Sequence, residues 1–74
     1  MMNYFDMLKE RLEPVLKGKE LTLETSFRDL GIDSLDLVDL VFELEDELGI
    51  QFEDDELANL NTVESLIRLV ESKK

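Results

Sequence analysis

The sequence predicts an all-α protein: a small four-helix bundle of three main helices and one short helix, with a long loop between the first and second helices. Apolar residues recur at spacings of three and four in three separate segments, as they do on one face of a helix. No segment shows a convincing period-two alternation, so no sheet is expected. At 74 residues the chain is long enough for one domain at most, which we place at residues 1–74.

The first helix is expected from Asn3 to about Lys17. Asn3 is suited to cap its start. Pro14 lacks the N–H that would bond back to Glu10, so it should kink the last turn or end the helix. Gly18 is a plausible stop. The predicted apolar stripe of this helix consists of Phe5, Leu8, Leu12, Val15 and Leu16.

A long loop is expected from Lys19 to Asp33. The stretch Ser26–Asp29 has the composition of a single helical turn. A loop of this length in a small domain is usually functional or held by packing. The apolar residues expected to anchor it are Leu21, Leu23, Phe27 and Leu30.

The second helix is expected to begin after Asp33, its N-cap, with Asp36 at the third helical position and Gly49 at its end. At about 100° per residue its apolar residues fall into two arcs. The core arc holds Leu37, Leu40, Val41, Leu44 and Leu48. The second arc holds Leu35, Val38 and Phe42, rimmed by the acidic residues Asp39, Glu45 and Asp46. This second arc either packs under the neighbouring loop or forms a docking surface, because an apolar centre with a charged rim is typical of interfaces.

Two shorter segments complete the predicted bundle. Residues Asp54–Leu60 form a short helix at best. Asn61 or Thr62 is expected to cap the last helix. The apolar stripe of that helix consists of Val63, Leu66, Ile67 and Val70.

The charge is strongly negative and clustered. The net charge is −11, and between Asp29 and Glu64 the chain carries 13 acidic residues and no basic one. Nucleic acid is not an expected partner because its phosphates would be repelled. The natural complement is a basic protein surface, although the charge could also serve solubility alone. There is no apolar run long enough for membrane insertion and no secretion signal, so a cytoplasmic location is expected.

The composition excludes most autonomous catalysis. The chain contains no histidine and no cysteine, which rules out Ser-His-Asp and Cys-His arrangements and thiolate metal sites. Its three glycines are too scattered for a phosphate-binding loop, and the EF-hand pattern is absent, so no specific metal site is expected. We therefore expect a protein that is not an enzyme.

Ser34 is the residue that remains to be explained. With Asp33 able to cap, Ser34 becomes the first helical residue, with its hydroxyl outward beside free backbone N–H groups. This is a favourable place to attach a phosphate, provided that another protein supplies the base and any metal. The alternative is an ordinary first-turn residue, since serine is common there.

At these residues the sequence resembles the acyl carrier proteins. The stretch LGIDSLDLVDLV, Leu30 to Val41, is similar to their prosthetic-group attachment motif, whose core is Asp-Ser-Leu. The resemblance covers essentially the whole chain. It includes SFRDLGIDSLD before and through the motif, LEDELGI at the end of the second helix, and NTVESLI at the start of the last one.

The resemblance implies a function. A phosphopantetheinyl transferase with its own magnesium would attach 4′-phosphopantetheine covalently to Ser34, and the terminal thiol would carry acyl chains as thioesters. Asp33, Leu35 and Asp36 would flank the arm, and the core stripes of the helices would sheath the acyl chain. The resemblance favours a monomeric carrier for fatty acid synthesis enzymes with basic docking patches. Their contact residues on this chain would be Leu35, Val38, Asp39, Phe42, Glu45 and Asp46.

Two alternatives remain open from the sequence. One is a related carrier that serves polyketide, peptide, aminoacyl or lipid-tailoring enzymes. The other is an acidic interaction module without a prosthetic group. A mass spectrum after incubation with coenzyme A and a transferase separates the second alternative from both carrier functions.

Overall fold

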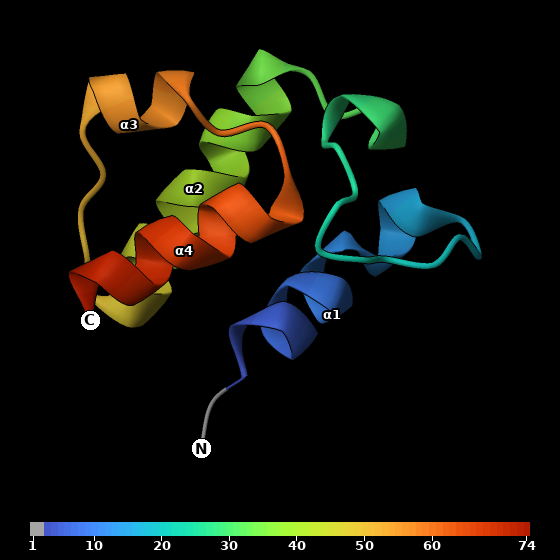
Figure 1. The fold of residues 1–74 in the computed structure, drawn as a ribbon, viewed down its shortest axis with the longest axis horizontal. Helices are drawn as coiled ribbons and strands as arrows, with labels where there is room; N and C mark the ends of the chain where they lie inside the picture. Colours follow the sequence, from blue (N-terminus) through green and yellow to red (C-terminus); the bar gives the residue numbers. More distant parts are fainter. Residues whose placement is uncertain (1–2) are drawn as a thin grey trace.

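The computed structural model describes residues 3–74 and shows an all-α fold (Figure 1). Within those residues there is no strand, and the one isolated bridge joins Ser26 to Thr62. The predicted fold class is therefore confirmed. The elements in chain order are α1 (Tyr4–Leu16), the 3₁₀ turn η1 (Arg28–Leu30), α2 (Ser34–Leu48), α3 (Asp54–Ala58) and α4 (Val63–Lys73).

Helix α1 begins where the sequence predicted. The Asn3 side chain accepts a hydrogen bond from the Asp6 backbone N–H at 3.2 Å, which satisfies one of the free donors of the first turn. One member of the predicted stripe was wrong: Val15 is exposed. It follows Pro14 on the outer side of the last turn, while the core face carries Leu8, Leu12 and Leu16.

The end of α1 differs in detail from the prediction. The helix continues two residues beyond Pro14 and ends at Leu16. The chain then turns through two left-handed residues, Lys17 at φ 50° and Gly18 at φ 84°. The turn closes with a hydrogen bond from the Lys19 N–H to the Leu16 carbonyl at 2.9 Å. Gly18 thus contributes to the stop, but Lys17 adopts the left-handed conformation first.

The loop after α1 is held by fewer apolar anchors than predicted. Leu21 and Phe27 are buried and Leu30 is half-buried, but the Leu23 side chain is exposed and is not an apolar anchor. The expected helical turn forms as η1, two residues later than Ser26–Asp29. Phe27 is buried just before this turn, and its carbonyl accepts the N–H groups of Leu30 at 3.1 Å and Ile32 at 3.0 Å.

The loop is also joined to the start of α4 by its backbone. Because the first N–H groups of a helix have no partner within the helix, they need acceptors elsewhere. Two loop carbonyls accept N–H groups from the start of α4, and one loop N–H donates to the carbonyl just before α4. The three hydrogen bonds are Phe27 N to Asn61 O at 3.0 Å, Val63 N to Thr25 O at 3.0 Å, and Glu64 N to Leu23 O at 2.9 Å.

Helix α2 has the predicted boundaries. Asp33 caps it by accepting the Asp36 N–H at 2.9 Å, and Gly49 at φ 69° ends it. Leu37 is half-buried and packs against the core. The fully buried members of its core arc are Leu40, Val41, Leu44 and Leu48.

The two C-terminal helices are both capped by reciprocal hydrogen bonds. Glu53 and Glu56 form a capping box at α3, and Thr62 and Ser65 form one at α4. Thr62 is therefore the cap that the sequence left undecided between two residues. Ile67 is only half-buried. The predicted stripe of α4 is otherwise confirmed, with Val63, Leu66 and Val70 in the core.

Charged side chains join the helices around this core. Arg11 of α1 contacts Glu43 of α2 at 3.0 Å and also forms an ion pair with Glu47. At the other end, the Lys73 ammonium lies 2.7 Å from the Glu56 carboxylate and so ties α4 to α3. The C-terminus lies near the end of α2 (Figure 1).

Candidate functional site

Ser34 is the first residue of α2 and is exposed. The extended backbone and side-chain cap of Asp33 fix the start of the helix, and the Asp33 carbonyl accepts the Leu37 N–H at 3.0 Å. The hydroxyl therefore stands at the positive end of a helix of 15 residues, where an attached anion is stabilised. Within residues 3–74 it makes no hydrogen bond that would restrain or activate it.

The other serines are committed to local structure. Ser65 is part of the α4 capping box and also donates to the Thr62 carbonyl at 2.7 Å. Ser72 donates to the Leu69 carbonyl at 2.6 Å. Ser26 is half-buried at the bridge to α4. Ser34 is thus the serine whose hydroxyl is exposed and free for chemistry.

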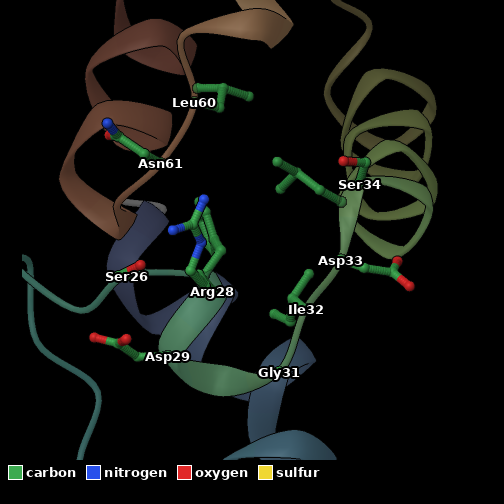
Figure 2. A pocket seen from close by; sticks show the side chains of 11 residues that line it. Ser26, Arg28, Asp29, Gly31, Ile32, Asp33, Ser34, Leu60 and Asn61 are labelled. Atoms are coloured by element: carbon green, nitrogen blue, oxygen red, sulfur yellow. The ribbon is translucent and has the colours of Figure 1, made fainter.

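An open cavity of about 840 Å³ lies beside Ser34. Figure 2 shows the side chains around it: η1 forms the base, the first turn of α2 one wall, and the turn before α4 the opposite wall. The Ser34 hydroxyl is on the cavity side of its helix, whereas the Asp33 carboxylate points away. The lining residues are Ser26, Phe27, Arg28, Asp29, Gly31, Ile32, Asp33, Ser34, Leu37, Leu60 and Asn61.

A second, smaller cavity of about 320 Å³ also reaches Ser34. It lies between α2 and α3, and Leu37 and Leu60 line both cavities. Its other lining residues are Val38, Val41, Asp54, Leu57 and Ala58. A group attached to Ser34 therefore has two possible paths, one towards η1 and one between the helices. Sequence reasoning could not find either cavity, because each is built from segments far apart in the chain.

The six predicted docking residues do not form one uniform surface. Leu35 and Phe42 project into solvent with 77% and 58% of their surface exposed. Val38 is half-buried because it lines the cavity under α3. Val38 thus lies under α3 and not under the long loop that the sequence offered as the alternative.

The three acidic residues of the predicted rim also differ in their exposure. Asp39 and Asp46 are exposed. Glu45 is half-buried, and its carboxylate accepts the backbone N–H of Phe52 at 2.7 Å. Glu45 thus holds the segment between α2 and α3, a role that only the tertiary structure reveals.

The carboxyl group of Glu56, in the acidic segment, has a lowered pKa. The Lys73 ammonium donates to Glu56, and the Glu53 N–H adds a second hydrogen bond at 2.8 Å, so the pKa of Glu56 lies below its ordinary value. The ion pair joins α3, which covers the smaller cavity, to α4.

Within residues 3–74, no group of three or more acidic, histidine or cysteine side chains is arranged to hold a metal ion. None of the helices in that range has the length and apolarity that a membrane crossing requires.

A small helical bundle with an exposed serine at the start of an acidic helix is compatible with a class of protein that carries a covalently attached group, and the comparisons with known proteins identify that class. The family model described as a phosphopantetheine attachment site matches residues 6–70. A crystal structure of an acyl carrier protein from Thermotoga maritima is also similar. It has 33% sequence identity and a TM-score of 0.77, and the match covers 95% of this chain and 80% of that one. The chain belongs to the phosphopantetheine-binding carrier family of the acyl carrier proteins.

Membership has direct consequences. The prosthetic group of the family is covalent 4′-phosphopantetheine, and its members are carriers, not enzymes. This agrees with a chain that has no histidine and no cysteine, because the thiol that carries the cargo belongs to the prosthetic group.

Proposed function

We propose that this chain is an acyl carrier protein of fatty acid synthesis and that Ser34 is its attachment residue. The single observation that carries the assignment of Ser34 is its position: an exposed, unbonded hydroxyl at the first turn of α2 beside the larger cavity. The hydroxyl oxygen would displace the adenosine bisphosphate of coenzyme A at phosphorus, and its proton would pass to a base of the transferase. The bound arm then supplies the thiol that forms thioesters.

Residues around Ser34 fit this group. The hydroxyl is accessible to a transferase, and the free N–H groups of the helix start favour the phosphodiester charge. Asp33 holds the helix start through its cap, while Leu35 and Asp36 flank the serine on the exposed side. These residues position the attachment point and need not contact the cargo.

The acyl chain is proposed to shelter in the smaller cavity between α2 and α3. Val38, Val41 and Leu57 offer an apolar lining there. Each CH₂ removed from water contributes about 0.8 kcal/mol, so a medium-length chain should raise the melting temperature above that of the unloaded holo protein. An equal melting temperature would place the chain on the surface.

Attachment is tested by mass spectrometry after incubation with coenzyme A, magnesium and a phosphopantetheinyl transferase. The wild type should gain one phosphopantetheine, as should the control Ser72→Ala. Ser34→Ala should gain none while keeping its helical circular dichroism, because Ser34 contributes no side-chain hydrogen bond to the fold. Modification that persists in Ser34→Ala would contradict the assignment.

The pathway needs a separate test. The holo protein is incubated with a malonyl-transfer enzyme and a condensing enzyme of fatty acid synthesis, together with malonyl and acetyl donors. A thioester extended by two carbons, seen by mass spectrometry, is the expected product. A holo protein that these enzymes do not load or extend would be a carrier for another pathway.

We also propose that residues 1–74 act as one monomeric domain in the cytoplasm, where coenzyme A and the partner enzymes are available. Light scattering during size-exclusion chromatography tests the monomer directly. The docking surface proposed for partner enzymes has Leu35 and Phe42 at its centre and Asp39 and Asp46 at its rim, with basic patches as the complement.

A further inference from the structure

The cavity beside Ser34 contains a single basic side chain. Of the eight Lys and Arg residues in the sequence, only Arg28 lines this cavity. Figure 2 shows its side chain rising from η1 into the space between Ser34 on one wall and Asn61 on the other. A cation is notable there, because Asp33 and Asp36 make the surroundings of Ser34 acidic.

Arg28 has no ionic partner among residues 3–74. The arginines and lysines that form ion pairs in that range are Arg11, Arg68 and Lys73. Two carboxylates are close to Arg28 in sequence, but Figure 2 shows those of Asp29 and Asp33 directed away from the guanidinium. The charge of Arg28 is therefore available to a ligand in the cavity.

The backbone around Arg28 is fixed with respect to the opposite wall. Phe27 is 2% exposed, and its N–H donates to the Asn61 carbonyl at 3.0 Å. The Arg28 carbonyl accepts the Gly31 N–H at 2.9 Å and so closes η1. Arg28 is exposed, and its side chain extends from this hydrogen-bonded turn into the cavity (Figure 2).

We propose that Arg28 binds the phosphodiester that joins the arm to Ser34, and so directs the arm into the larger cavity rather than between α2 and α3. The inference rests on the proposed attachment at Ser34. A guanidinium pairs with phosphate oxygens through two N–H donors, and it offsets the repulsion between that phosphate and the nearby carboxylates.

The rest of the cavity suits the remainder of the arm. Pantetheine alternates amide groups with a dimethyl carbon and short methylene segments, so it needs both polar and apolar contacts. Asn61 and Ser26 offer polar side chains, while Ile32 and Leu60 offer apolar ones. The unloaded arm is therefore held along η1, which leaves the apolar cavity under α3 for an acyl chain.

The absence of cysteine from the chain allows a specific experiment. The thiol of the arm is the only thiol of the holo protein, so a nitroxide label reacts there alone. Wild type, Arg28→Gln, Arg28→Lys and the control Arg68→Ala are first driven to full modification, which mass spectrometry verifies. The broadening of backbone amide signals by the label then reports which wall the arm visits.

In the wild type, Gly31 and Asn61 should broaden more than Leu57 and Ala58. The ratio of broadening at Gly31 and Asn61 to broadening at Leu57 and Ala58 measures the preference of the arm for the larger cavity. Arg28→Gln should lower this ratio by about 1.5- to 5-fold, the range expected for one exposed ion pair. Arg28→Lys should keep most of the ratio because the charge remains. Arg68 lies on α4 and does not line this cavity, so Arg68→Ala should leave the ratio unchanged.

A second readout is the ³¹P chemical shift of the phosphodiester. It should differ between wild type and Arg28→Gln at low salt and converge as salt screens the pair. Equal broadening patterns and equal ³¹P shifts in these two proteins would overturn the proposal while leaving attachment intact. A wild type that gains no mass would overturn attachment at Ser34 and this proposal with it.

Discussion

The exposed carboxylates of α2 allow a quantitative test of docking. Asp39 and Asp46 are the rim residues without a structural task, whereas Glu45 binds the Phe52 N–H at 2.7 Å and must be left intact. We therefore choose the double substitution Asp39→Asn and Asp46→Asn. Both side chains keep their size and lose their charge, so the fold should not change.

The expected loss follows from the spacing of the two residues. They are seven positions apart on α2, or about 10 Å at 1.5 Å per residue, so their effects should add. Each exposed pair with a basic partner is worth about 0.2–1 kcal/mol. The sum, about 0.4–2 kcal/mol, corresponds to a weakening of Kd by about 2- to 30-fold.

Isothermal titration calorimetry of apo protein with a phosphopantetheinyl transferase measures this loss. The matched control is Glu10→Gln with Glu13→Gln on the exposed side of α1, which removes the same charge elsewhere. The Asp pair should matter more than the Glu pair, and the difference should shrink as salt rises. Equal Kd values for both pairs at every salt concentration would refute a localised docking surface and leave the charge as mere solvation.

Three further outcomes are expected. Phe42→Ala should weaken partner binding with little change in melting temperature, because 58% of the Phe42 residue is already exposed; a large loss of stability instead would show that the ring packs within the fold. Glu45→Ala should destabilise by about 1.5–3 kcal/mol, the range for a hydrogen bond to a charged group, and its melting temperature should fall, since the Phe52 N–H loses its acceptor; an unchanged melting curve would contradict this. Lys73 lowers the pKa of Glu56. The ionised Glu56 carboxylate therefore contributes fully to the stability of the fold above the ordinary glutamate pKa, and this contribution is lost as pH falls through the lowered pKa. Glu56→Gln should therefore lower the melting temperature at pH 7 and approach the wild type in acid, and a difference independent of pH would count against the ion pair.

Local signals in the sequence predicted the helix boundaries well. Asp33 and Gly49 act through their own side chain or backbone, so residue type and spacing were sufficient to place them, whereas the α4 cap was narrowed only to Asn61 or Thr62. The exposed serine at the start of α2 followed from the same reasoning. These features depend on contacts within one turn of helix and not on the tertiary fold.

The features that the sequence did not reveal depend on which neighbour covers a face of the helix. The helical wheel grouped Val38 with Leu35 and Phe42, but α3 covers only Val38. It placed Glu45 on the rim, but the chain after α2 brings the Phe52 N–H onto its carboxylate. An angle around one helix contains no information about the path of the next segment.

The sequence could not predict the larger cavity beside Ser34, which Arg28 lines, for a related reason. Its two walls are about thirty residues apart in sequence and meet only because the loop binds the start of α4. Spacing along the chain could not show that Arg28 and Ser34 share a space with Asn61.

The hydrogen bonds between the loop and α4 also bear on how this protein folds. They join residues 23–27 to residues 61–64, a separation of about half the chain, so the entropy of closing that large loop must be lost before they form. The N–H groups of Val63 and Glu64 have their acceptors in the loop, and the first turn of α4 is therefore completed only when the loop arrives. Contacts of this sequence separation slow folding relative to a bundle with local contacts alone. The long-range contacts that are expected to slow folding are thus the same contacts that bring the walls of the cavity beside Ser34 together.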